Sequence, residues 1–393
     1  MTGVTAWGAV TMARAIRPPE KIPVVDGLDA RPPGDGEWPS VSVVVPARNE
    51  ERNLPRLLPS LLSQRYPNYE VIVVDDQSTD STPRILAEWA GRDPRLRVVR
   101  GVDLPIEEGW KGKPFAMHQG AQVAAGDWLL FTDADTVHEP LCLSSAVAYA
   151  VERGIDLLTL VPCAELESPS ERLLMPIAYQ GIMVTYPAYS VNDPASKDAI
   201  ANGQYTLIRR EVYDAVGGIA RVKDKIAEDL EFGHLVKSEG YRLYLADGMS
   251  LLRVRMYTNL AEMWEGWSKN VVLSFEGRPD KALLAVLGIV VLSILPPVLA
   301  RWAVRSWKRA GASGKAPERI AAAWVVALAA WNIAIPLLFR RRVDRMLGLS
   351  PVWTLTQPIG MALFALIMLS TVVRLLTGRG VTWKGRSYHG RQM

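Results

Sequence analysis

Short apolar runs alternate with helix-like spacings over the first half of the chain. The runs are continuous, as expected for strands buried on both faces, and they lie at residues 41–45, 71–74, 96–99 and 128–132. The helix candidates between them are residues 54–62, a segment opened by Thr82-Pro83, and residues 112–125. Strands that alternate with helices predict βαβ units, and therefore an α/β fold with a mostly parallel sheet.

The last third of the chain has a different pattern. Residues 282–300, 320–339 and 351–373 contain no charge, and each stretch approaches the about 20 residues that cross a bilayer. Three such helices in a row are unusual in a soluble core, so three C-terminal helical membrane segments are expected. The apolar stretch at residues 4–13 is too short to span, and we interpret it as a peripheral or truncated anchor rather than a signal peptide.

Two amphipathic helices are predicted between the strands and the membrane segments. The first opens with a capping box, Ser168-Pro169-Ser170-Glu171. The apolar positions of the second recur every three or four residues, at Met256, Leu260, Met263, Trp264, Trp267, Val271 and Phe275. This pattern favours an interfacial helix with its tryptophans at headgroup depth and Lys269 on the polar face, although a core-packing stripe is the alternative.

Charge is distributed unevenly along the chain. The net charge is +4, but residues 281–393 hold 16 Lys or Arg against two acids, and the rest of the chain is acidic. This asymmetry argues against a uniformly basic nucleic-acid-binding protein. The two cysteines, Cys142 and Cys163, provide no disulfide framework and suit a reducing compartment.

Carboxylates follow the predicted strands. Asp75-Asp76 end the second strand, and Asp133-Ala134-Asp135 end the fourth. Ligands of open α/β sheets bind beyond the carboxyl ends of the strands, so these groups are expected in one crevice. Asp133 and Asp135 suit a divalent cation that also binds phosphate, although a solvated loop would explain the same residues. Neither a Gly-x-Gly-x-x-Gly nor a Walker motif occurs, so Lys111 or Lys113 is expected to help neutralise the phosphates.

The order of these motifs resembles glycosyltransferase family 2, whose members have a GT-A nucleotide-diphospho-sugar transferase fold. The resemblance covers residues 41–275 and rests on four motifs: residues 43–50, residues 73–80, Asp133-Ala134-Asp135 and Glu228-Asp229. It implies a nucleotide pocket lined by Pro46, Arg48, Glu50, Asp75, Asp76, Lys113 and Asp133. It also implies Mg²⁺ or Mn²⁺ on Asp133 and Asp135, and Asp229 as the general base of an inverting transfer.

The chain departs from the processive members of that family, which carry Gln-x-x-Arg-Trp after the base. Here Gly266 precedes Trp267, which favours single transfer over polymer synthesis. The sequence around Trp267 and the tail at residues 381–386 are more similar to membrane-bound carotenoid or hopanoid glucosyltransferases. That similarity implies UDP-glucose or another UDP-hexose as donor and a hydrophobic lipid acceptor, with Glu228, Trp264, Trp267 and Lys269 on the acceptor side.

The expected organisation has four parts. They are an N-terminal segment and linker (1–40), a GT-A catalytic domain (41–254), an interfacial helix (255–280) and a membrane region with a basic tail (281–393). The protein is expected at the cell membrane with its catalytic domain in the cytoplasm. Three crossings would then put the basic residues 301–319 outside, against the positive-inside rule, whereas Arg340–Arg345 would be inside. A re-entrant hairpin over residues 282–300, broken at Pro296-Pro297, removes this conflict.

Two alternative functions stay open. One is a processive polysaccharide synthase of the same family. The other is a membrane protein that binds nucleotide sugars without catalysis, which would have no need of a base at Asp229.

Overall fold

The computed structural model describes residues 17–33, 36–225, 227–275, 277–312, 316–377, 381–383 and 386–388. The expected N-terminal anchor and most of the basic tail lie outside these residues. The chain forms two compact units, and each is described by itself. The sheet unit comprises Arg17–Glu165 and Tyr186–Met256, and the helical unit comprises Leu166–Thr185 and the described residues from Tyr257 onward.

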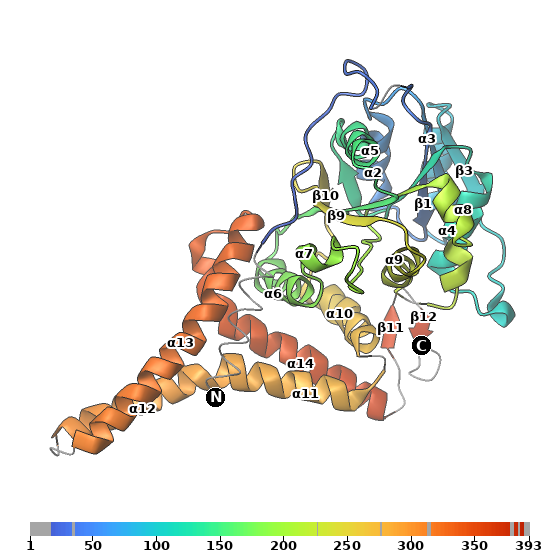
Figure 1. Ribbon diagram of the computed structural model, residues 1–393. Coiled ribbons are helices and arrows are strands. Elements are labelled where there is room, and N and C mark those ends of the chain that lie inside the picture. Colours follow the sequence, from blue (N-terminus) through green and yellow to red (C-terminus); the bar gives the residue numbers. More distant parts are fainter. Residues whose placement is uncertain are drawn as a thin grey trace. The chain divides into compact units, whose positions relative to one another are not determined.

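The sheet unit is built on a seven-stranded mixed sheet of order β3-β2-β1-β4-β8-β6-β9 (Figure 1). Its strands are β1 (Val41–Ala47), β2 (Tyr69–Asp75), β3 (Leu96–Arg100), β4 (Trp128–Phe131), β6 (Leu157–Val161), β8 (Thr206–Arg209) and β9 (Leu243–Asp247). β8 runs antiparallel to both neighbours, and the other pairings are parallel. A smaller sheet joins β5 (Thr136–His138), β10 (Leu252–Val254) and β7 (Cys163–Ala164). The predicted mostly parallel α/β fold is confirmed.

Helices cover both faces of the large sheet. They are α2 (Leu54–Leu62), α3 (Thr82–Ala90), α4 (Gly112–Val123), α5 (Cys142–Glu152), α7 (Ala188–Val191), α8 (Arg210–Ala215) and α9 (Glu228–Ser238), with 3₁₀ turns η1 (Ile106–Glu108) and η2 (Ile219–Val222). Val43 and Val45 of β1 join the cluster that contains α2 and α5, whereas Val44 joins the cluster that contains α4 and α9. Successive side chains of a strand point to opposite faces, so a continuous apolar run is what this arrangement requires.

Part of the expected N-terminal linker belongs to the core of the sheet unit. Ile22 is 1% exposed and Trp38 is 9% exposed, and both pack in the cluster with α2 and α5. Lys21 forms an isolated parallel bridge with Asp247 at the end of β9. The Pro- and Gly-rich composition of this segment therefore reflects an irregular path over the sheet unit rather than a free connection.

The helical unit contains the three apolar stretches. Its elements are α6 (Pro169–Thr185), α10 (Leu260–Ser274), α11 (Pro279–Ile289), the π-helical η3 (Val290–Ile294), α12 (Leu295–Ala312), α13 (Ala316–Met346), η4 (Pro351–Thr356), α14 (Gln357–Leu376), β11 (Val381–Trp383) and β12 (Arg386–Tyr388). By length and composition, three helical stretches could cross a membrane: Pro279–Ala310, Ala316–Met346 and Pro351–Leu376. The prediction of three such segments is confirmed.

The predicted re-entrant hairpin at Pro296-Pro297 is wrong. The chain is helical from Pro279 to Ala312, without a reversal. The π-helical turn Val290–Ile294 lies immediately before the prolines, and the Leu295 N–H donates to the Val290 carbonyl. A wider turn relieves the clash of a proline ring with the preceding turn, so these prolines modify the helix without ending it.

The apolar stripe of α10 is a helix-packing surface within this unit, the alternative that the sequence left open. Trp267 is 8% exposed, and its ring lies 5.8 Å from that of Phe364 on α14. Trp264 Nε1 donates to Ser370 Oγ at 3.0 Å, and Met263 is fully buried. α10, α11 and α14 lie side by side (Figure 1), and they share a small apolar cluster. Trp267 therefore packs against α14, and its expected position at headgroup depth stays a prediction.

A buried polar network replaces a backbone hydrogen bond that a proline removes from α6. The predicted capping box is present, since Glu171 N–H donates to Ser168 Oγ at 3.3 Å and Ser168 N–H donates to Glu171 Oε2. Pro176 lies inside this helix and has no N–H for the carbonyl of Arg172 four residues earlier. Arg340 supplies the missing donor: its guanidinium donates to the Arg172 carbonyl at 2.9 Å and to the Leu173 carbonyl at 3.2 Å.

The other contacts of Arg340 complete this network. Its Nε donates to Asp344 Oδ1 at 2.7 Å, and both side chains are 0% exposed. Thr354 Oγ1 donates to Asp344 Oδ2 at 2.7 Å, and Gln357 links Arg340 to Gln180 on α6. A buried ion pair is tolerated when its remaining polar atoms are hydrogen-bonded, and this one satisfies that condition.

Candidate active site

The loops after β1 and β2 are joined through their backbones. The Asp76 N–H donates to the Ala47 carbonyl at 2.8 Å, and Arg48 donates to the Asp76 carbonyl at 2.8 Å. Asn49 and Gln77 have positive φ of 54° and 56°, which turns each loop away from its strand. The structure therefore brings together the predicted nucleotide residues of the two loops.

Side chains in these loops fix the same arrangement. Asp75 Oδ1 accepts the Ser78 N–H at 3.0 Å, three residues on, and Glu50 Oε2 accepts a hydrogen bond from Asn53 Nδ2 at 2.6 Å. Both carboxylates are buried, as is that of Asp76. Gly101, at the end of β3, permits this packing because a Cβ there would lie 2.9 Å from the Asp75 carbonyl oxygen.

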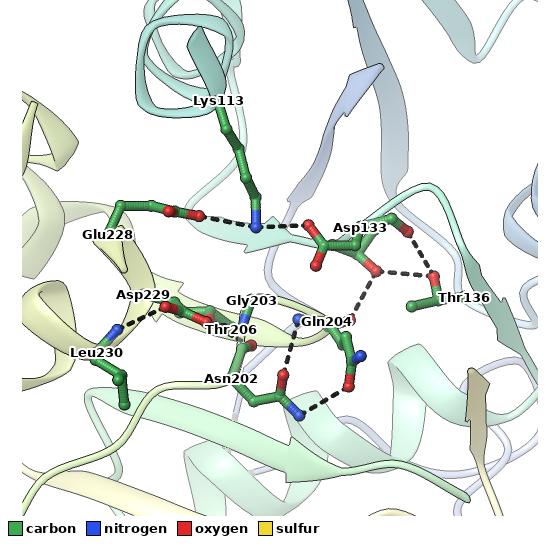
Figure 2. Close-up of polar contacts among 11 residues, drawn as sticks. Lys113, Asp133, Thr136, Asn202, Gly203, Gln204, Thr206, Glu228, Asp229 and Leu230 are labelled. Atoms are coloured by element: carbon green, nitrogen blue, oxygen red, sulfur yellow. Dashed lines mark hydrogen bonds and ion pairs between the residues drawn. The ribbon is translucent and has the colours of Figure 1, made fainter. Parts of the chain in front are cut away.

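A second group of charges surrounds Lys113 on α4. Lys113 Nζ lies 2.7 Å from Asp133 Oδ1, just beyond β4, and 2.8 Å from Glu228 Oε1 on α9 (Figure 2). The side chain of Glu228 is 4% exposed, whereas those of Lys113 and Asp133 are 36% and 28% exposed. One ammonium thus joins two carboxylates that are almost a hundred residues apart in sequence.

Asp229 lies beside this group. Its Oδ2 accepts the Gly203 N–H at 3.0 Å, and its Oδ1 accepts the Leu230 N–H at 2.9 Å. A Cβ on Gly203 would lie 2.8 Å from Lys113 Nζ, 3.1 Å from Asp229 Oδ2 and 3.4 Å from Asp133 Oδ2. Lys113, Asp133 and Asp229 therefore converge on the face of Gly203, and a glycine leaves them room (Figure 2).

The electrostatics of this group follow from one cation among three carboxylates. Desolvation lowers the pKa of Lys113, but Asp133, Glu228 and Asp229 together raise that pKa well above its ordinary value. Burial raises the pKa of Glu228, and Asp229 raises it further, although Lys113 opposes both effects. The formal charge of the four side chains is negative, because one ammonium faces three carboxylates.

Asp133 and Asp135 provide a donor set that fits a divalent cation carrying a phosphate group. Both are hard oxygen donors, and Asp135 Oδ1 is buried in the turn between β4 and β5. Among the described residues, no three His, Cys, Asp or Glu side chains are grouped to hold an ion by themselves. Mg²⁺ typically binds one or two carboxylates plus substrate phosphates, which these two aspartates would allow.

His138 is a buried neutral residue beneath this site. It is 3% exposed, and its Nε2 lies 3.1 Å from the hydroxyl oxygens of both Thr132 and Thr136. Burial lowers the pKa of His138 to about 3. Its role is to support the turn that carries Asp133, because the Thr136 hydroxyl also donates to the Asp133 carbonyl at 2.8 Å.

The expected acceptor-side residues do not all lie in one unit. Glu228 belongs to the sheet unit, whereas Trp264, Trp267 and Lys269 belong to α10 of the helical unit. Sequence reasoning assigned Lys113 only to phosphate and did not anticipate its ion pair with Glu228. The sequence Asn202-Gly203-Gln204 is compatible with a wall of the sugar pocket and equally with an ordinary turn before a strand. The glycine between two amides was the available signal, but the sequence cannot show which side chains approach it.

The comparisons with known proteins all find glycosyltransferases. Residues 42–217 match the model of a family described as glycosyl transferase family 2. The chain is 28% identical over 255 residues to 4,4'-diaponeurosporenoate glycosyltransferase of Staphylococcus haemolyticus, covering 64% of this chain and 66% of that protein. The protein of the same name from Staphylococcus aureus is 28% identical over 257 residues, covering 63% and 65%. The matches thus span just under two thirds of these relatives.

The fold is also similar to that of a solved enzyme. A mannosyltransferase from Pyrobaculum calidifontis, in complex with GDP-Man and Mn²⁺, superposes with a TM-score of 0.52 at 19% identity, over 95% of each chain. At that identity the similarity establishes the GT-A-like fold and leaves the ligands of this chain to be argued from its own residues.

Proposed function

We propose that the protein transfers a hexose from a nucleotide-diphosphate donor to a hydroxyl of a hydrophobic lipid, because residues 42–217 match the model of glycosyl transferase family 2. UDP-glucose is the proposed donor. A carotenoid-like acceptor is proposed because the relatives are named as glycosyltransferases of 4,4'-diaponeurosporenoate. The three stretches long and apolar enough to cross a membrane support an acceptor held in a bilayer.

The observation that carries the proposal is the group around Lys113. It joins Asp133, which follows a strand at the ligand-binding edge of the sheet, to Glu228-Asp229 at the start of α9. A donor site and a candidate base are thereby combined in one place. A protein that only binds nucleotide sugars would need the first and not the second.

In the proposed reaction the acceptor hydroxyl attacks the anomeric carbon while Asp229 removes the hydroxyl proton. A new C–O bond to the lipid forms, the bond from the anomeric carbon to the diphosphate breaks, and the nucleoside diphosphate leaves with the electron pair. Two backbone N–H groups hold Asp229, which keeps its carboxylate oriented. A single displacement of this kind inverts the configuration at the anomeric carbon.

Other residues bind and neutralise the donor. Arg48, Asp76 and Glu50 line the proposed nucleotide pocket, and Lys113 provides a cation near the diphosphate. Asp133 and Asp135 would hold Mg²⁺ or Mn²⁺, which would stabilise the charge of the departing diphosphate. The chemistry of the donor set supports this assignment.

Processive polymer synthesis has less support. Position 266, which precedes Trp267, is a glycine packed against the ring of Tyr257, and a Cβ there would lie 2.7 Å from Tyr257 Cζ. An arginine at this position would require Tyr257 to move. The structure therefore favours transfer of one sugar.

Mass spectrometry of lipids tests the proposal. A host that supplies carotenoid lipids should accumulate a product heavier by one hexose when it expresses the wild type, and should not when it expresses Asp229→Asn. Glu231→Gln is the matched control, because Glu231 is an exposed carboxylate in the same turn of α9. Product formation by Asp229→Asn at the wild-type level would contradict the assignment of the base.

A further inference from the structure

The ammonium of Lys113 lies so close to Asp133 that it competes with any other cation for this carboxylate. It lies 2.7 Å from Asp133 Oδ1, within the range of a charge-assisted hydrogen bond. A divalent cation on this carboxylate would share it with the ammonium or displace it. Two cations on one carboxylate repel each other, so Lys113 opposes binding of the metal alone.

Lys113 is also held from the opposite side. Glu228 is buried, and its Oε1 lies 2.8 Å from Lys113 Nζ. Gly203 leaves just enough room for this position, since a Cβ there would lie 2.8 Å from Nζ. The ammonium therefore has a defined place beside Asp133 and is not a freely moving surface lysine.

We propose that Lys113 makes metal binding depend on the donor. The ammonium suppresses binding of a divalent cation to Asp133 and Asp135 until a nucleoside diphosphate supplies anionic oxygens for both cations. Metal and donor then bind with positive cooperativity, and the protein without donor does not hold the metal tightly. This inference rests on the proposed function only in assigning Asp133 and Asp135 to the metal.

The reciprocal effect follows from the same geometry. Removing the ammonium should strengthen binding of the metal alone and weaken binding of the nucleoside diphosphate. An ordinary phosphate-binding lysine would show only the second effect. The opposite directions of the two changes therefore distinguish this role from simple anion binding.

The test is Mn²⁺ binding to the purified full-length protein in detergent, measured by the electron paramagnetic resonance signal of free Mn²⁺. In the wild type, UDP should lower the Kd for Mn²⁺ at least tenfold. In Lys113→Met, Mn²⁺ without UDP should bind at least tenfold more tightly than to the wild type. UDP should then lower the Kd for Mn²⁺ by a smaller factor than in the wild type, because the diphosphate oxygens can still bind the metal. Lys225→Met, which removes a lysine paired with Asp224, should behave as the wild type.

A second variant distinguishes a change in metal binding from a loss of folding. Lys113→Met leaves Glu228 buried without its cation, so Lys113→Met/Glu228→Gln removes that charge and leaves Asp133 intact. Equal Mn²⁺ affinity of the wild type and both variants without UDP overturns the inference, as does lack of Mn²⁺ binding in all three. Lipid hexosylation by the wild type, measured separately, tests the proposed function and does not depend on either outcome.

Discussion

Each of the two units contains a cation in an ion pair, but only the pair in the helical unit is fully buried and fully hydrogen-bonded. In the helical unit, Arg340 faces the single carboxylate of Asp344, and all of its nitrogens donate to oxygen atoms of α6, α13 or α14. In the sheet unit, Lys113 faces three carboxylates, and the group is partly open to solvent.

This difference separates a structural network from a reactive one. A satisfied ion pair with no exposed atoms has no capacity for a ligand, and its value lies in fixing the helices. A group with excess negative charge and an accessible edge favours a cation and keeps a carboxylate available as a base. Variants in the Lys113 group should therefore change turnover, whereas variants in the Arg340 network should change the free energy of unfolding.

The largest effect on chemistry is expected from Asp133→Asn. This change removes a charge that we propose to hold the metal and leaves Lys113 with Glu228, so turnover should fall by about 100-fold or more. The free energy of unfolding should change by less than about 1 kcal/mol, because Asp133 is partly exposed. Initial rates of hexose transfer and denaturant titration measure both, with Asp127→Asn as the control at the opposite end of β4. If Asp133→Asn lost stability and retained turnover, the Lys113 group would be structural, and the contrast with the Arg340 network would be wrong.

The largest effect on stability is expected from Arg340→Met. It leaves Asp344 charged and unpaired and removes the donor for the Arg172 carbonyl, which should cost about 3–5 kcal/mol. Unfolding of the full chain in detergent measures this. The double variant Arg340→Met/Asp344→Leu should recover part of the loss, because it removes the unpaired charge. Unchanged stability of the single variant would mean that the network does not hold α6.

Much of the sheet unit could be predicted from sequence because its signals are local. Strands β1 to β4 and helices α2 to α4 follow from apolar spacing, caps and turn residues. Their alternation also predicts that ligands bind at the carboxyl ends of the strands. The antiparallel insertion of β8 and the approach of α9 to α4 depend on contacts between distant segments. Glu228 and Lys113 are 115 positions apart by the numbering of the sequence, and no periodic pattern joins them.

The helical unit was harder to predict. A basic residue beside an apolar stretch can lie at the membrane surface or in a buried ion pair, and an apolar stripe can face the membrane interface or pack against another helix. Arg340 was interpreted as a positively charged residue at the membrane surface, although it is fully buried against α6. Its role depends on Pro176, which lies in another part of the chain. The tryptophans of α10 were likewise compatible with an interface or with packing, and the contact of Trp267 with Phe364 decides for packing.

A smaller, pH-dependent effect is expected from His138. The folded protein holds it neutral with a pKa of about 3, whereas the unfolded chain binds a proton near pH 6.5. Stability should therefore be complete above pH 6.5 and fall as the pH is lowered, by about 2 kcal/mol at pH 5. Denaturant titration at pH 7 and pH 5 measures this. His138→Gln should reduce the difference, and an equal pH dependence in this variant would exclude His138 as its source.

The smallest effect is expected from Gly203→Ala. The added methyl group would press on Lys113 and Asp229, both of which can shift slightly, so turnover should fall about tenfold with little change in stability. Gly181→Ala is the control, because a Cβ there meets nothing within 4 Å. Initial rates compare the two. Unchanged turnover in Gly203→Ala would mean that the convergence of charges on Gly203 is not required for the reaction.

The most direct test measures turnover and stability on the same preparations of Asp133→Asn and Arg340→Met. The full-length proteins would be placed in liposomes with a lipid acceptor and UDP-glucose, and hexose transfer would be related to the amount of folded protein. We predict that Asp133→Asn is as stable as the wild type but inactive, whereas folded Arg340→Met retains turnover but unfolds more readily. An inactive, fully stable Arg340→Met together with an active Asp133→Asn would contradict the account.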